Sequence, residues 1–89
     1  MGFFSRGKPV PVIGLRKDSD TPMGAIWSLI CTDADCEHRL AGGELVDVER
    51  VLGAGDIINV RPRNGGARRF ALRVTGREDD VVHCTRVDR

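Results

Sequence analysis

The chain has 89 residues, of which 40% are hydrophobic and 30% charged, and its formal net charge at pH 7 is +1. This length excludes several domains and this balance excludes a disordered chain, so we expect one small globular domain. No apolar run approaches the ~20 residues of a membrane span, and residues 1–6 hold too short an apolar patch for a signal peptide. We therefore expect a cytoplasmic protein with no membrane partner.

The near-neutral total hides a strong segregation of charge along the chain. Residues 33–56 hold seven acidic side chains against Arg39 and Arg50, whereas residues 61–73 hold five arginines and no acid. Local asymmetry of this kind says more about binding partners than the net charge does.

Residues 1–23 are predicted to form an extended N-terminal arm, and residues 24–89 a single small β domain. Pro9 and Pro11 exclude a helix and disfavour a central strand, so residues 10–15 would pair only at a sheet edge. Phe3 and Phe4 either pack back on the domain or face a partner, and the pattern slightly favours packing back.

The middle of the chain contains one clear strand and two less regular stretches. Residues 25–31 are short and rich in β-forming side chains on both faces, which predicts a central strand or one covered on one side. Residues 32–40 are polar and acidic and are predicted to form a loop. Residues 44–52 fit a strand or a short helix capped by Gly53, and we favour the helix.

The last third of the chain contains three alternating runs, at residues 57–61, 69–74 and 81–87. Turn signals rich in Gly, Asn and Asp separate them, at residues 64–66 and 76–80. Alternation bounded by such turns predicts an antiparallel meander.

The alternation also predicts the strand register, because directly opposed residues share a face of the sheet. Val60 opposite Phe70 keeps both side chains inward and leaves a three-residue loop at residues 64–66. For the second hairpin we expect Val74 opposite Val82. This register would place Leu72 opposite Cys84, with Cys84 facing inward, and Arg73 opposite His83.

These elements predict a mainly β fold with one short helix. Strands at residues 25–31, 57–62, 68–75 and 81–87, with a fifth from the arm, suit a small rolled antiparallel sheet, or an SH3-like or OB-like barrel of four to five strands. Such folds host many unrelated functions, so the function must be argued from particular residues.

The best candidate site is the arginine-rich hairpin. The predicted register places Arg61 opposite Arg69, with Arg63 and Arg73 on the same outer face and Arg68 near the tip. Opposed like charges are destabilising by up to roughly 1 kcal/mol, which an anionic partner would offset. We therefore expect a non-enzymatic binding module for nucleic acid, and the scarcity of aromatic side chains favours a duplex or structured RNA.

Two alternatives use the acidic middle segment, residues 33–56. The protein could be an adaptor or inhibitor subunit that docks through the basic hairpin and this segment, on a protein with an acidic surface, on its own copies, or within a larger assembly. The acids from Asp33 to Glu37 could also pair with the arginines of the same chain.

The cysteine and histidine side chains could form a metal site, but their spacing along the sequence does not favour one. Cys31, Cys36, His38 and Cys84 could supply four ligands to a structural zinc, with His83 beside the last of them. The spacing differs from the usual C-x2-C, however, and we favour buried or loop thiols without a cofactor. No arrangement typical of a catalytic site is present, so we expect no enzyme.

Overall fold

A computed structural model describes residues 9–31, 34–64 and 66–87 of the chain. Phe3 and Phe4, for which the sequence suggested packing on the domain, lie outside the described residues. Among the described residues, no helix has the length and apolar character needed to cross a membrane.

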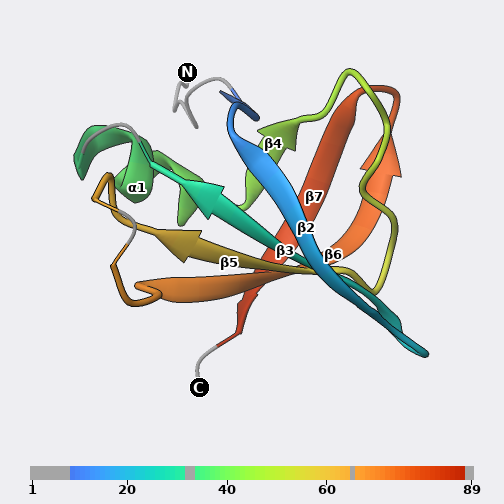
Figure 1. The fold of residues 1–89 in the computed structure, drawn as a ribbon. Helices are drawn as coiled ribbons and strands as arrows, with labels where there is room; N and C mark the ends of the chain where they lie inside the picture. Colours follow the sequence, from blue (N-terminus) through green and yellow to red (C-terminus); the bar gives the residue numbers. More distant parts are fainter. Residues whose placement is uncertain (1–8, 32–33, 65, 88–89) are drawn as a thin grey trace, which may run out of the picture.

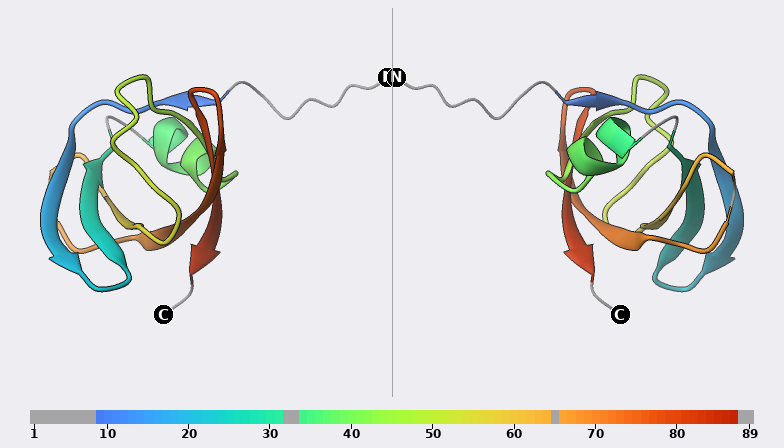
Figure 2. Two further views of the ribbon diagram at one scale, coloured as in Figure 1. Left: turned by 90° about the vertical axis from the view of Figure 1, so that its right-hand side faces the viewer. Right: turned by 90° about the vertical axis from the view of Figure 1, so that its left-hand side faces the viewer.

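In the described part of the chain, seven strands form one curled, mixed sheet in the order β1-β4-β7-β6-β5-β3-β2, which makes a half-barrel (Figure 1). Figure 2 shows that the sheet curls until β3 and β7 face each other, with helix α1 between them near one end. The elements in chain order are β1 (Val10–Pro11), β2 (Leu15–Thr21), β3 (Gly24–Ile30), α1 (Ala34–Leu40), β4 (Glu44–Val46), β5 (Ile57–Arg61), β6 (Phe70–Glu78) and β7 (Val81–Val87).

The mainly β fold with one short helix is confirmed, but the prediction of four to five antiparallel strands is wrong. The sheet has seven strands, and two of its pairings, β1 with β4 and β3 with β5, are parallel. A parallel neighbour requires a long crossover connection, which α1 and β4 provide between β3 and β5.

The edge strand β2 was not predicted, because its side chains carry no alternating pattern. All of its residues except Leu15 are exposed, and it pairs antiparallel with β3. Charged side chains on an outermost strand hinder pairing with other chains. At the opposite edge, Val10 and Pro11 pair with β4, as expected for a proline-containing segment.

Residues Ala34–Leu40 form the helix α1, whereas the sequence predicted a loop at residues 32–40. Asp35 and Glu37 occupy its first turn and His38 and Arg39 its last, an order that complements the helix dipole. Cys36 and the fully buried Leu40 are four residues apart and contact the core from the same face. That spacing was the signal that the polar composition of this stretch concealed.

The short helix favoured for residues 44–52 is wrong. Glu44–Val46 form β4, which pairs antiparallel with β7. Beyond it, the Asp47 carboxylate accepts hydrogen bonds from the backbone N–H groups of Arg50, at 3.1 Å, and Leu52, at 2.8 Å. Arg50 has a φ of 58°, so this turn and its hydrogen bonds replace the helix.

The register predicted for the first hairpin is confirmed. Val60 lies opposite Phe70 and Ile58 opposite Leu72, and all four side chains are buried. The ladder stops at this pair, however, so the connection spans residues 62–69 and not only the three predicted residues.

The register predicted for the second hairpin is wrong by two residues. Val74 lies opposite Cys84, because β6 extends to a tight turn at residues 79–80 and a bulge follows Val74. Leu72 consequently faces Arg86 on β7, and Arg73 faces Thr85. Cys84 nevertheless packs against the core, as expected.

The core lies inside the curl of the sheet. Its buried apolar side chains come from the inward faces of β3, β5, β6 and β7, and α1 and the segment after β4 close the open end. The largest fully buried side chains are Leu40, Leu45, Ile58, Leu72, Val60, Val74 and Val82.

Candidate functional site

The five arginines of the predicted site do not act together in the structure. Arg61 is half-buried, whereas Arg63, Arg68, Arg69 and Arg73 are exposed. Three of the five, Arg61, Arg68 and Arg69, contact other elements of the same chain.

Arg61 is held by a polar network on the outer face of the sheet. Its Nε donates to Ser28 Oγ at 3.3 Å and its Nη1 donates to the Gly66 carbonyl at 3.3 Å. The buried Ser28 hydroxyl in turn donates to the Asp18 carboxylate. This hydrogen bond, with the charges of Arg16 and Arg61, holds the pKa of Asp18 below its ordinary value despite partial desolvation. Arg61 therefore joins the loop at residues 62–69 to β3 and β2.

Arg69 points towards the helix. Its Nε lies 3.5 Å from Glu37 Oε2 on α1, so one acid of residues 33–37 does pair with a hairpin arginine, an alternative that the sequence left open. The prediction that Arg61 lies opposite Arg69 in the ladder is wrong, because the pairing of β5 with β6 ends at Val60 and Phe70. Arg61 instead binds Ser28, and Arg69 binds Glu37.

The remaining arginines are exposed around the outer face of β5 and β6. Arg68 Nη1 donates to Asn59 Oδ1 at 3.1 Å, which places Arg68 beside this face. Arg73 projects from β6 opposite Ile57, and Arg63 lies in the loop at residues 62–69. No acidic side chain among the described residues forms an ion pair with Arg63 or Arg73.

Much of the acidic middle segment is used inside the fold. The buried Asp56 accepts hydrogen bonds from Trp27 Nε1 at 3.0 Å and from the N–H of Ala25 at 2.9 Å. Asp47, also buried, forms an ion pair with Arg77 at 3.0 Å. With Glu37 bound to Arg69, the segment presents far less acidic surface than its composition suggested.

The suggested zinc ligands are not brought together. Cys31 is buried in the core, and burial raises the pKa of the Cys84 thiol to about 12, which disfavours the thiolate that a metal requires. Within the part of the chain that the structure describes, no group of three or more His, Cys, Asp or Glu side chains could hold a metal ion. His83 instead lies 3.5 Å from both Glu44 and Glu78.

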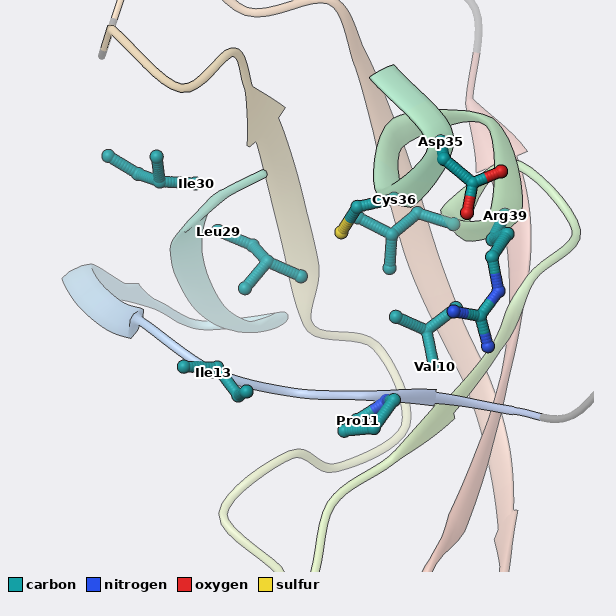
Figure 3. A pocket seen from close by; sticks show the side chains of 9 residues that line it. Val10, Pro11, Ile13, Leu29, Ile30, Asp35, Cys36 and Arg39 are labelled. Carbon is teal, nitrogen blue, oxygen red and sulfur yellow. The ribbon is translucent and has the colours of Figure 1, made fainter. Parts of the chain in front are cut away.

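The surface of the described residues has hollows that were not foreseen, because each joins residues distant in the sequence; three of them bear on function. A cavity of about 190 Å³ lies between α1, β1 and the end of β3, and in Figure 3 the Cys36 sulfur points into it while Arg39 reaches towards Val10. A second hollow, of about 500 Å³, lies beside the β2–β3 turn. The third, of about 310 Å³, lies between α1, the start of β6 and β7.

No protein-family model, curated protein or solved structure matches this chain. The function is therefore argued from the geometry and charge of these surfaces.

Proposed function

We propose that this protein is a non-enzymatic binding module that contacts the phosphates of duplex or structured nucleic acid through Arg63, Arg68 and Arg73. The observation that carries the proposal is the exposure of these three arginines along the β5–β6 ribbon. Among the described residues, Arg63 and Arg73 form no ion pair with an acidic side chain. Arg61 and Arg69, which the sequence also assigned to the site, position the loop between β5 and β6. They are therefore not part of the proposed contact surface.

The neighbours of these arginines suit a phosphate backbone. Asn59, which accepts from Arg68, is neutral, and so is Thr85, which lies opposite Arg73. From the level of Ile57 to that of Arg61 the ribbon extends about 13 Å, at ~3.3 Å per residue. Guanidinium groups spread over this length can meet successive phosphates, which supply much of the affinity of a protein for nucleic acid.

The aromatic side chains support a duplex or structured ligand over an unpaired strand. Phe70 is buried, and Trp27 is half-buried with its indole N–H bound to Asp56. Proteins that bind single strands without sequence preference use exposed aromatic rings as stacking platforms. Within the described residues no aromatic ring is exposed in this way.

Salt dependence of binding tests the proposal. We expect the R63Q/R68Q double variant to bind a duplex more weakly, because each lost phosphate contact lowers the slope of log K against log salt by about 0.9, or about 1.8 for both. The measurement is a fluorescence titration with labelled duplex at several salt concentrations. R16Q, which removes an exposed arginine on β2, is the matched control.

The result expected is a flattened salt dependence for the double variant and a nearly unchanged slope for R16Q. Equal slopes in all three proteins, or no binding by the parent protein at low salt, would overturn the proposal.

A second candidate function, docking on another protein as an adaptor, is favoured by the β2–β3 turn. Met23 at this turn is 84% exposed, and beside it lies the hollow of about 500 Å³, whose lining includes Pro22, Ile26, Ile57 and Arg73. Exposed Met and Arg beside apolar surface are typical of protein interfaces.

If this turn docks on a protein, M23S should reduce the amount of that partner recovered with the tagged chain from its native host. V48S is the control, since Val48 is 71% exposed on the loop after β4, away from this hollow. Equal recovery with the parent chain and M23S would exclude the turn as the docking surface.

A further inference from the structure

A hollow of about 310 Å³ lies between the helix and the paired strands β6 and β7. Its lining consists of Glu37, His38, Ala41, Arg69, Phe70 and Arg86. These residues come from three separate stretches of the chain, so no sequence motif marks the site. Its size is at the lower end of the range typical of small-molecule sites.

The side chains that line this hollow carry an excess of positive charge. Arg69 and Arg86 supply two positive charges to this lining, and Glu37 supplies one negative charge. A ring nitrogen of His38 offers a further hydrogen bond at the edge of the hollow. The hollow therefore favours an anion over a cation or an uncharged ligand.

Both guanidinium groups are held in place by neighbouring side chains. The Arg86 guanidinium lies 4.8 Å from the centroid of the Phe70 ring, a cation–π contact against a side chain that is itself buried. Arg69 meets Glu37 through Nε, so its two Nη groups carry donors beyond that contact. Donors held in place in this way lose less conformational entropy when a ligand binds.

We propose that this hollow binds the phosphate group of a phosphate monoester, with Arg69 and Arg86 as its principal ligands. Guanidinium forks match the geometry of phosphate oxygens and bind them with paired hydrogen bonds. A phosphate dianion suits the site better than a carboxylate, because Glu37 already supplies one carboxylate to Arg69. The Glu37 carboxylate therefore competes with a bound phosphate for Arg69, and removing its charge should strengthen phosphate binding.

This site is independent of the proposed nucleic-acid surface, because it uses none of Arg63, Arg68 and Arg73. The phosphate could belong to a small phosphorylated molecule or to the terminal phosphate of an oligonucleotide. Both present the same chemistry to Arg69 and Arg86, and the experiment below separates them.

The test is a titration with inorganic phosphate, followed by ¹⁵N NMR at constant ionic strength. We expect saturable shifts in the backbone amides of α1, Phe70 and Arg86. R86Q should lower the association constant about tenfold, as expected for the loss of a charge-assisted hydrogen bond. E37Q should have the opposite effect and raise the association constant.

Two controls make the same charge changes elsewhere. R16Q removes an exposed arginine on β2, and E49Q removes an exposed acid in the turn after β4. Both should leave the association constant within about twofold of that of the parent chain. If R86Q unfolds the protein, R86K keeps the positive charge while removing the fork, and it should still weaken phosphate binding.

NMR shifts that do not saturate, or effects of R16Q and E49Q as large as those of R86Q and E37Q, would overturn the proposal of a phosphate site.

The source of the phosphate follows from comparing a duplex with and without a 5′-phosphate. A preference for the phosphorylated end that R86Q removes identifies the nucleic-acid source. Equal binding of the two duplexes, with phosphate binding retained, identifies a small phosphorylated molecule.

Discussion

Asp47 connects the loop after β4 to the hairpin of β6 and β7. Its side chain is 4% exposed and accepts hydrogen bonds from two backbone N–H groups and from Arg77 Nη2. Arg77 also donates to the carbonyls of Leu52, at 2.7 Å, and Asp79, at 3.2 Å. A buried carboxylate and a guanidinium that are both hydrogen-bonded in this way hold residues 47–52 in place without regular secondary structure.

Stability should therefore depend on pH through Asp47. Desolvation raises the pKa of Asp47, but the Leu52 N–H and the Arg77 guanidinium outweigh it and hold the pKa below the ordinary value of 3.8. A carboxyl whose pKa is lowered by folding stabilises the fold above its unfolded pKa, and this contribution is lost as the pH falls through the folded pKa.

We expect D47N to lower the free energy of unfolding by about 1.5–3 kcal/mol at neutral pH, the range for hydrogen bonds to charged groups. The deficit should shrink below the folded pKa of Asp47, where the parent chain also carries a neutral side chain. Urea unfolding at pH 7 and at the lowest pH at which the parent chain remains folded measures both values, with D20N as the exposed control. An equal deficit at the two pH values would contradict this role.

At the scale of elements, α1 decides how the hairpin arginines are used. Arg68 and Arg69 are adjacent in the chain but contact different partners, Asn59 on the outer face of β5 and Glu37 on α1. Because the sequence predicted a loop at residues 32–40, it placed no helix beside the start of β6. The division of the arginines into structural and exposed ones follows from that helix.

The structural role of Arg61 and Arg69 predicts a loss of stability when both are removed. We expect R61Q/R69Q to lower the free energy of unfolding by about 1 kcal/mol, because a partly exposed ion pair contributes ~0.2–1 kcal/mol and the half-buried hydrogen bonds of Arg61 add to it. R63Q/R73Q removes the same charge from exposed positions and should change stability by less than about 0.5 kcal/mol. If R61Q/R69Q were more stable than the parent chain in urea unfolding, the repulsion predicted from the sequence would be real.

At the scale of the whole molecule, the sheet remains an open half-barrel with β1 and β2 at its two edges. The open end is filled from the side, where the fully buried Leu40 and Leu45 and the buried Leu52 meet the inward faces of the strands. Closure of the core therefore depends on the crossover from β3 to β5. The same crossover places Glu37 and His38 beside β6 and β7, which creates the hollow proposed to bind phosphate.

The sequence by itself determined that β5, β6 and β7 form an antiparallel meander and which faces of these strands point inward. It predicted the strand β3 but not the parallel pairing of β3 with β5. The alternation of apolar and polar side chains is a local pattern, and face matching across one short connection was enough to pair Val60 with Phe70. It was not enough beyond the bulge after Val74, because a single extra residue changes which side chains oppose.

Only the tertiary structure decided the other elements and the sites. The edge strand β2 is polar and forms against β3, β4 forms against β7, and α1 is a short helix that its packed face stabilises. Arg61, Arg69 and the acids of the middle segment find their partners across these long-range contacts. No local pattern encodes those distances, since the free energy that favours them comes from burial and pairing between segments far apart in the chain.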